Sequence, residues 1–482
     1  MSTAVSFLPS AASTNQDAEI RRVFERQREA ALRLRASTAE ERKAKIRRLK
    51  DAVLAHAEDI RRAGEADFKK PPAEVDLTEI LPVVAEANDA LRKLKKWMKP
   101  TRVWPSRAAV GLKAWVQYQP KGRCLIISPW NYPVNLSFGP LVSALAAGNA
   151  AILKPSEMTP NLSAVMVKIV REVFPEDEVA IFEGDARVAQ ALLELPFDHI
   201  FFTGSPAIGK VVMAAAAKHL ASVTLELGGK SPTIIDETAD LKAAARNILW
   251  GKFTNDGQTC IAPDYIYVHA TVKEAFVQHC RQTLEASYGA DPQAWKRSPY
   301  LARIVNARHT ARIKVLLDDA RARGARVLTG GEVDESACYV APTLLDGIPE
   351  DAKIMEEEIF GPLLPIIAYD DLDQVVRRIN AQPKPLALYI WSRNRAHIDK
   401  VMTLTSSGGA CINNTVVHFL HGNLPFGGVN NSGIGNAHGH WGFKAFSHER
   451  AVVRTRIPLA AMFFPPYTDW TRRIARLLIK TV

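Results

Sequence analysis

The chain lacks the cysteine patterns of a secreted scaffold or a structural metal site. Its 482 residues include only five cysteines, an odd number, and no Cys-x-x-Cys pair occurs. A disulfide framework and a structural zinc site are therefore not expected. A reducing compartment is the default for such a sequence, so we expect a cytoplasmic protein.

Long uninterrupted apolar segments are also missing. The longest, from Leu136 to Leu153, is broken by glycine, proline and asparagine, which favours a buried helix and a strand over a membrane span. Residues Met1 to Gln16 have no basic segment followed by an apolar core, so we expect no secretory signal.

The positive charge is not accompanied by any nucleic-acid-binding motif. The net charge is +11, and much of the excess lies in residues 21–62 and 472–480. Solvated helix faces are the simplest interpretation, and attraction to anionic surfaces is the alternative. Without a motif, we expect no nucleic acid among the partners.

The length and the periodicity indicate an α/β protein of two or three domains. Helical spacing extends over Asp17–Arg35 and Thr38–Glu65, and Ser37 with Glu40 fits a capping box at the second start. Strands and helices then alternate from 123 to 219, which predicts a parallel sheet with crossover helices. Alternation returns over 233–276 and 339–379, which indicates a second α/β domain, while 100–119 is expected to form an extended arm or hairpin.

One cysteine ends a polar, turn-forming run. Cys260 follows Gly257, Gln258 and Thr259, whereas a structural cysteine usually lies among aliphatic residues. Because only the thiolate is a strong nucleophile, a reactive thiol needs an accessible and specialised surrounding. The run therefore makes Cys260 a candidate nucleophile.

Polar side chains follow several predicted strands of the first domain, at the edge where open α/β sheets bind ligands. Asn131 lies in the run Pro129–Pro133 and could donate its side-chain N–H to an oxyanion, although a turn asparagine is the alternative. Lys154 and Glu157 could bind the hydroxyls of an adenosine ribose. An acidic residue there favours a free 2′-hydroxyl and thus NAD.

Two further strand ends carry glycines. Gly204, Ser205 and Gly209 open a predicted helix, whose free N–H groups could hold a phosphate. Glu226 lies in an apolar run before two glycines, where burial would raise its pKa towards that of a general base, and a salt-bridged structural glutamate is the alternative. Farther along, Glu358 could bind sugar hydroxyls.

Two aromatic residues beside glycine turns are candidates for a pocket wall. Phe360 and Phe426 each precede or accompany a glycine in the runs 356–362 and 424–428, and core-and-turn packing is the alternative for both.

Seven motifs in one order make the chain resemble the aldehyde dehydrogenase superfamily. They are PWNYP, LKPSE, FTGS, LELGGK, GQTCIAPDY, EEIFGP and LPFGG. The likeness extends from Asp17 to Arg456 and is nearest to the class 3 branch, which contains fatty, aromatic and coniferyl aldehyde dehydrogenases.

The resemblance implies a chemistry. Cys260 would form a thiohemiacetal and then a thioester, Asn131 and the Cys260 N–H would hold the oxyanion, and Glu226 would activate water. NAD, with NADP as a second cofactor, would be held by Lys154, Glu157, Gly204, Ser205, Gly209, Glu358 and Phe360. No metal ion would be needed, and the substrate would be an apolar aldehyde, long-chain aliphatic or aromatic.

The resemblance also implies a fold with a Rossmann-like cofactor domain, an α/β catalytic domain and a small β bridging arm. We expect residues 1–99 and 120–226 in the NAD(P)-binding domain, 227–433 in the catalytic domain, and 100–119 with 434–456 in an arm that forms a homodimer. Relatives commonly carry glycine where Asn430 stands, near the substrate entrance. Asparagine tolerates the left-handed backbone that such a turn requires.

The C-terminal residues 457–482 extend beyond the shared pattern. Trp470, Ile474, Leu477 and Leu478 can share a helix face flanked by arginines, as in an interfacial membrane helix. A helix over its own or a partner's substrate entrance is the alternative. Two other functions stay open at this point: a coenzyme A-acylating dehydrogenase, and a non-catalytic binding or structural protein on the same scaffold.

Overall fold

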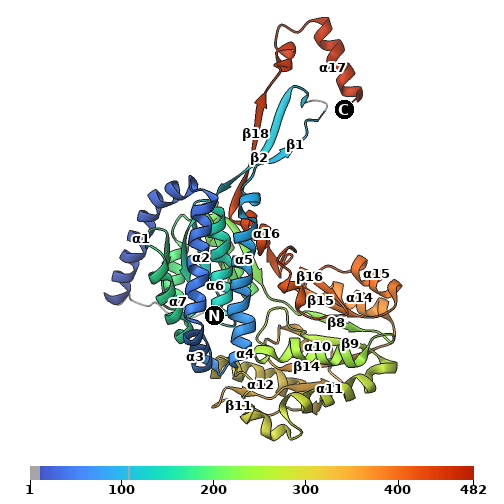
Figure 1. Cartoon of the computed structure of the whole chain (residues 1–482). Coiled ribbons are helices and arrows are strands. Elements are labelled where there is room, and N and C mark those ends of the chain that lie inside the picture. Colours follow the sequence, from blue (N-terminus) through green and yellow to red (C-terminus); the bar gives the residue numbers. More distant parts are fainter. Residues whose placement is uncertain (1–10, 107–108, 482) are drawn as a thin grey trace, which may run out of the picture.

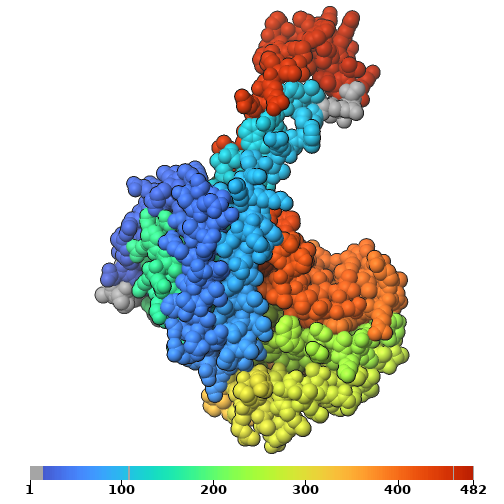
Figure 2. Space-filling model, viewed as in Figure 1, coloured from blue at the N-terminus to red at the C-terminus, as the bar shows by residue number. Residues whose placement is uncertain are grey.

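The protein consists of two α/β lobes and a narrow arm that projects from them (Figures 1 and 2). The computed structural model describes residues 11–106 and 109–481, so the predicted absence of a signal in Met1–Gln16 falls largely outside the described residues. The α/β architecture predicted from the alternating strands and helices is confirmed.

The first lobe is built on a six-stranded sheet in which every neighbouring pair is parallel except β17 with β7. In spatial order its strands are β17 (Gly433–Ile434), β7 (Ser222–Leu227), β6 (His199–Gly204), β3 (Arg123–Ile127), β4 (Ala150–Lys154) and β5 (Val179–Ile181). The polar residues singled out in the sequence follow or end β3, β4, β6 and β7, so they meet at one edge of the sheet.

Helices cover both faces of this sheet, because its strands bury alternate side chains on opposite sides. Along β3, Cys124 and Ile126 pack in one core cluster, whereas Leu125 and Ile127 pack in the other. The first cluster is covered by α2 (Ala39–Ala55), α3 (Ala57–Phe68), α5 (Leu81–Trp97), α6 (Pro133–Ala147), α7 (Pro160–Val173) and α16 (Gly439–Ala445). The second is covered by α1 (Ala11–Arg35), α8 (Ala186–Leu193) and α9 (Pro206–Ala217).

Two details of the N-terminal helices differ from the predictions. The single helix expected over Thr38–Glu65 is divided at His56, whose ring lies 3.0 Å from Asp59 and 2.9 Å from Glu172. The capping box is formed by Thr38 and Glu41, one residue later than predicted, because the Ser37 hydroxyl bonds Leu34 and Arg42 instead.

The second lobe contains a seven-stranded sheet that is parallel except between β10 and β13. In spatial order its strands are β10 (Arg326–Thr329), β13 (Thr343–Asp346), β14 (Leu363–Tyr369), β9 (Tyr265–His269), β8 (Pro232–Ile235), β15 (Ala387–Trp391) and β16 (Gly409–Ile412). The larger helices around it are α10 (Leu241–Phe253), α11 (Lys273–Tyr288), α12 (Ala307–Ala322), α14 (Leu372–Ala381) and α15 (Arg395–Leu404).

The arm is a three-stranded antiparallel sheet of β1 (Thr101–Val103), β2 (Leu112–Pro120) and β18 (Ser447–Thr455). The hairpin expected over 100–119 is therefore present. The second predicted arm segment, 434–456, contains β18, but its first half forms α16, which contacts α6 in the first lobe. Beyond β18, α17 (Asp469–Thr481) lies at the far end of the arm (Figure 1).

Candidate active site

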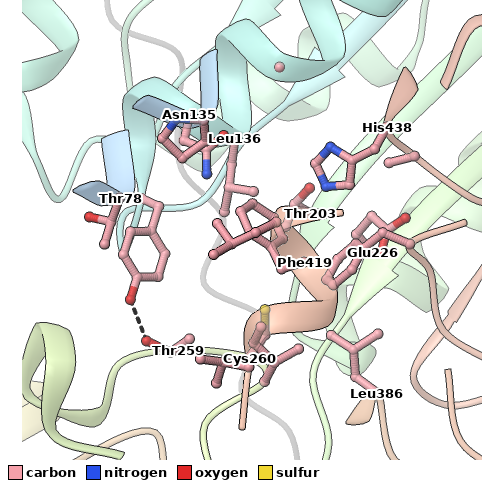
Figure 3. Close-up of a pocket in the computed structure, with 18 of the residues that line it drawn as sticks. Thr78, Asn135, Leu136, Thr203, Glu226, Thr259, Cys260, Leu386, Phe419 and His438 are labelled. Atoms are coloured by element: carbon pink, nitrogen blue, oxygen red, sulfur yellow. Dashed lines mark hydrogen bonds between the residues drawn. The ribbon is translucent and has the colours of Figure 1, made fainter. Parts of the chain in front are cut away.

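A mainly apolar cavity of about 190 Å³ lies between residues of both lobes. Cys260 and Glu226 line it together, although they are distant in the sequence (Figure 3). Residues of α6, β6 and α10 and of the segments 77–82 and 416–420 form part of its wall. The structure thus brings the candidate nucleophile and the candidate base to one cavity.

The turn before Cys260 has a backbone that few sequences can adopt. Asn255, Asp256 and Gly257 all have positive φ angles, of 55°, 54° and 77°. Asparagine, aspartate and glycine tolerate this left-handed region best, so the polar run singled out in the sequence is what the turn needs. A Cβ at Gly257 would also collide with the main chain of Gly361.

The Cys260 thiol is half-buried, and its sulfur points into the cavity (Figure 3). Burial, together with the nearby carboxylates of Glu358 and Glu226, raises the pKa of Cys260 to about 12. Only the small deprotonated fraction is strongly nucleophilic, so deprotonation of this thiol limits its reactivity.

Hydrogen bonds fix the loop that carries the thiol. The fully buried Gln258 side chain donates to Asn255 O at 2.9 Å and Arg303 O at 3.0 Å, and accepts from Val305 N at 2.9 Å. The Tyr132 hydroxyl bonds Thr259 Oγ1 at 2.5 Å. The nucleophile loop is therefore held from two sides.

Asn131 joins the turn after β3 to this loop. It is buried, and its Nδ2 donates to the main-chain oxygen of Gln258 at 2.9 Å. The main-chain oxygen of Asn131 accepts from Asn255 Nδ2 at 3.0 Å. A side-chain amide has two N–H donors, so the second remains for another acceptor, and Asn131 itself is not among the residues that line the cavity.

Glu226 is buried at the end of β7 without a partner. Neither carboxylate oxygen has a hydrogen bond to any described residue, and burial raises the pKa of Glu226 well above its usual value. The alternative interpretation, a salt-bridged structural glutamate, is therefore wrong. An unpaired buried carboxylate costs stability, which favours a functional reason for its presence.

Lys154 and Glu157 lie together where β4 ends. The buried Lys154 Nζ donates to Pro155 O at 2.9 Å and to Glu157 Oε2 at 3.3 Å, and Glu157 is exposed. On the other side of β3, Gly204 closes β6 and Ser205 caps α9, with its hydroxyl accepting from Ile208 N at 3.4 Å. A donor, an acceptor and a helix N-terminus thus meet at one sheet edge.

Two other predicted cofactor residues lie in the second lobe or at its border. A Cβ at Gly228 would collide with the Glu358 carboxylate, so glycine makes room for that side chain. Burial raises the pKa of Glu358 to about 8, and its Oε1 has no partner among the described residues. Phe360, at a φ of 48°, meets the Trp130 ring edge-on at 5.3 Å.

These features fit a dinucleotide. The unpartnered Glu358 oxygen suits a sugar hydroxyl, Lys154 and Glu157 suit a second ribose, and the N-terminus of α9 suits the phosphates between them. Gly209 permits the close approach of α9 to the sheet, because a Cβ there would lie 2.7 Å from the Leu227 side chain.

The predictions from sequence missed several cavity residues. Phe426 lines the cavity as expected, whereas Phe360 is not among its lining residues. Tyr132, Thr203 and His438 were not singled out, because nothing in their local sequence distinguishes a wall residue from a core residue. Asn430 has the expected left-handed backbone, with φ of 56°, but is not among the residues that line this cavity.

One group of metal-ligand type lies elsewhere. Atoms of Asp236, Glu237 and His397 come within 4.8 Å of one another. The Asp236 carboxylate already accepts from Thr238 and Ser392 and lies 3.0 Å from His397 Nδ1. Hydrogen bonding within the protein accounts for this cluster.

Comparison with known proteins gives one consistent family. The sequence model described as "Aldehyde dehydrogenase family" matches residues 9–452. A Bacillus subtilis (strain 168) protein named "Putative aldehyde dehydrogenase AldX" is 50% identical over 90% of this chain and 97% of its own length. The 4,4'-diaponeurosporen-aldehyde dehydrogenase of Staphylococcus aureus is 42% identical over 88% of this chain and 92% of its own.

Other relatives belong to the predicted branch. A Pseudomonas aeruginosa protein named "Probable coniferyl aldehyde dehydrogenase" is 41% identical over 93% of this chain and 94% of its own length. Proteins named as family 3 members also match.

Solved structures agree with these sequence relatives. The substrate-bound state of Staphylococcus aureus AldH superposes with a TM-score of 0.90 at 40% identity, covering 95% of this chain and 99% of that one. PnpE from Pseudomonas sp. WBC-3, solved in complex with nicotinamide adenine dinucleotide, gives a TM-score of 0.82 at 26% identity, covering 91% of this chain and 90% of that one.

Proposed function

The chain belongs to the aldehyde dehydrogenase family, whose members use NAD(P), and we propose that it oxidises apolar aldehydes to carboxylic acids through a thiohemiacetal and a thioester on Cys260. The observation that carries this proposal is the shared cavity. Cys260 and an unpartnered Glu226 face the same mainly apolar space.

The first covalent step uses the sulfur as nucleophile. The Cys260 thiolate adds to the aldehyde carbon, and the carbonyl π electrons move to the oxygen, which becomes an alkoxide. The Asn131 side-chain N–H and the Cys260 backbone N–H would donate to this oxyanion. Because Asn131 is already held by Gln258, little reorganisation would be needed as the charge develops.

The remaining steps oxidise the adduct on Cys260 and release the product. When bound, NAD(P) supplies the acceptor for the aldehyde hydrogen and its electron pair, which leaves a thioester on Cys260. Glu226 would take a proton from water, whose oxygen adds to the thioester carbonyl, and the sulfur departs to release the carboxylic acid. A raised pKa suits Glu226 to this proton transfer.

The cofactor would lie along the edge already described. Lys154 and Glu157 would hold the adenosine ribose, Ser205 and the first N–H groups of α9 the pyrophosphate, and Glu358 with Phe360 the nicotinamide end. Since Glu157 is acidic, we propose NAD as the preferred cofactor and NADP as a second one.

The cavity supports an apolar substrate, aliphatic or aromatic. Exposed apolar side chains surround its entrance: Leu77 is 53% exposed, Trp250 49% and Leu420 60%. Such a patch favours contact with an apolar ligand. Two relatives have names that specify coniferyl and diaponeurosporen aldehydes. Rates with decanal, benzaldehyde and cinnamaldehyde would rank these classes, and preference for a short polar aldehyde would contradict the proposal.

The alternative in which coenzyme A receives the acyl group is disfavoured, because Glu226 lines the same cavity as Cys260 and would serve as the base for hydrolysis. Product analysis distinguishes the two: free acid should form at the same rate with and without coenzyme A. Formation of an acyl-coenzyme A in its place would establish the alternative.

The test of the proposed function is Cys260→Ser. Aldehyde-dependent NADH production should be lost, while NAD binding measured by calorimetry should persist. A matched control is Cys411→Ser, since this second cysteine is outside the cavity lining and its thiol lies 3.2 Å from His418 Nδ1. Undiminished turnover by the Cys260 variant would refute the proposal. No turnover by wild type with any aldehyde, despite NAD binding, would favour the non-catalytic alternative.

We propose further that the arm forms a homodimer. It projects from the body and exposes apolar side chains, among them Trp104 at 93% and Val453 at 59% (Figure 2). Such surface is rarely left uncovered. Light scattering should give twice the chain mass, and Trp104→Glu should reduce it. A monomeric wild type would contradict this.

The tail is proposed as a peripheral membrane contact of a cytoplasmic protein. In α17 the exposed Trp470 accompanies Arg472, Arg473 and Arg476. None of the helices among residues 11–106 and 109–481 is both long and apolar enough for a bilayer span. The full chain should co-sediment with anionic vesicles, and a chain without residues 467–482 should not. Equal pelleting would favour the alternative of a helix over a substrate entrance.

A further inference from the structure

A completely buried ion pair lies behind the Asn131 turn. Lys70 and Glu79 have no exposed surface, and Lys70 Nζ lies 2.9 Å from Glu79 Oε1. Burying two charges costs desolvation energy that their attraction often does not recover. A stabilising role alone therefore explains the pair poorly.

The contacts of Lys70 lead to the active site. Its Nζ lies 3.4 Å from the main-chain oxygen of Asn131 and 4.1 Å from the centre of the Tyr132 ring. Tyr132 lines the cavity, and its hydroxyl bonds Thr259, the residue before Cys260. One cation thus contacts both the oxyanion residue and a wall of the substrate cavity.

Glu79 acts on the other side of the same turn. Its Oε2 accepts from the main-chain N–H of Asn135 at 3.0 Å, at the start of α6. The residue before α6, Tyr132, provides no side-chain cap of its own. Helix N-termini have N–H groups without intrahelical partners, and a carboxylate satisfies them well. Glu79 therefore supplies from a separate segment the cap that this helix lacks.

The local backbone explains how one segment serves both the cavity and the turn. Glu79 lies in the π-helical turn Asp76–Ile80, a rare conformation that is frequent at functional sites. Leu77 and Thr78 of this turn line the cavity, while the next residue, Glu79, points into the protein behind Asn131.

We propose that Lys70 and Glu79 are positioning residues for the oxidation of the aldehyde. The pair fixes the turn Pro129–Pro133 from behind, and thereby sets the Asn131 amide relative to Cys260. This role rests on the proposed function. Both charges are needed, because Lys70 binds the main-chain oxygen of Asn131 and Glu79 binds the main-chain N–H of Asn135. Each charge also neutralises the other in the protein interior.

The experiment replaces both charges with apolar side chains of similar length, as Lys70→Met with Glu79→Leu. Such replacements are often tolerated in stability. The double variant should fold and bind NAD as wild type does, yet its burst of NADH with decanal should slow by about tenfold to 100-fold, as expected for a misplaced catalytic group. A decrease of less than about tenfold would overturn the proposal.

A matched control is Lys273→Met with Asp346→Leu, another largely buried pair, which lies in the second lobe. Its burst rate should equal that of wild type. If the Lys70 and Glu79 variant does not fold, Lys70→Gln with Glu79→Gln takes its place, because it retains hydrogen-bonding groups without charge. Its NADH burst should be slower than that of wild type, and an unchanged burst would overturn the proposal.

Two further readouts separate positioning from general stability. The triple variant, which combines Asn131→Ala with both charge replacements, should have the same burst rate as Asn131→Ala alone. If the losses in burst rate multiply instead, the pair does not act through Asn131. A crystal structure of the double variant should show the bond from Asn131 Nδ2 to Gln258 O lengthened beyond 2.9 Å. An unmoved turn would overturn the proposal even if no aldehyde is found to be a substrate.

Discussion

The side chain of Asn131 donates a hydrogen bond of 2.9 Å to the main-chain oxygen of Gln258, two residues before Cys260. Asn131 follows a strand of the first sheet, whereas Gln258 precedes a strand of the second. The bond therefore fixes the candidate oxyanion donor to the nucleophile loop across the two lobes.

Asn131→Ala should slow formation of the thioester. The loss of one oxyanion donor costs about 100-fold to 1,000-fold in comparable sites. The NADH burst in stopped-flow would report it. Asn161→Ala, which removes an amide bonded to Asp67 on the surface, is the control. A burst of wild-type rate in the Asn131 variant would remove this residue from the mechanism.

Glu226→Gln should slow hydrolysis of the thioester while leaving its formation nearly intact. Removal of a general base typically costs about 100-fold to 10,000-fold. A burst of one NADH per active site followed by a slow steady state is expected, and Glu194→Gln on the surface should have no effect. Equal decreases of burst and steady state would show that Glu226 acts earlier than proposed.

The reaction rate should rise with pH. Cys260 and Glu226 must both be deprotonated to act, and burial raises the pKa of each, that of Cys260 to about 12. The turnover number should therefore continue to increase from about pH 6 to pH 9. A catalytic carboxylate with an ordinary pKa would already be deprotonated below this range, and the rate would then level off. In Glu226→Gln the steady-state rate should lose most of this dependence. A maximum near pH 6 in the wild type would disagree with these pKa shifts.

Glu226 should also reduce stability at alkaline pH. Because the pKa of Glu226 is raised in the folded protein, the folded protein keeps a proton that the unfolded chain releases above about pH 4.5. The free energy of unfolding therefore falls as the pH rises from about 4.5 towards the folded-state pKa. Glu226→Gln should thus raise the melting temperature more at pH 8 than at pH 5. Equal shifts at both pH values would mean that the carboxylate is not buried and unpaired.

Glu157→Gln should shift cofactor preference towards NADP. A carboxylate near a ribose 2′-position repels a 2′-phosphate, and removing the charge should improve kcat/KM for NADP relative to NAD by about tenfold. Glu194→Gln serves again as a control for lost surface charge. An unchanged ratio would place Glu157 away from the adenosine ribose.

The sequence was sufficient for the features that depend on local rules. The alternation of apolar segments predicted the parallel sheet of the first lobe and a second α/β domain, and the polar run before Cys260 matches a turn with three left-handed residues. The sequence contains glycines at 204, 209 and 228, but it does not show which side chains lie against them, namely Phe202, Leu227 and Glu358. The break at His56 was missed because it depends on Glu172, which is remote in sequence.

The least predictable part was the support behind the site. Lys70 and Glu79 resemble ordinary surface charges of a helical segment, and only the fold buries them against Asn131 and Asn135. Likewise, only the fold shows that Glu226 is unpaired, since the local apolar sequence is compatible with a paired and an unpaired glutamate.

The most direct test of the mechanism is mass spectrometry of Glu226→Gln mixed with NAD and decanal. The account predicts a stable decanoyl adduct on the peptide that contains Cys260, formed only when NAD is present and absent from the variant that also carries Cys260→Ser. An adduct on another cysteine, or no adduct despite production of NADH, would contradict it.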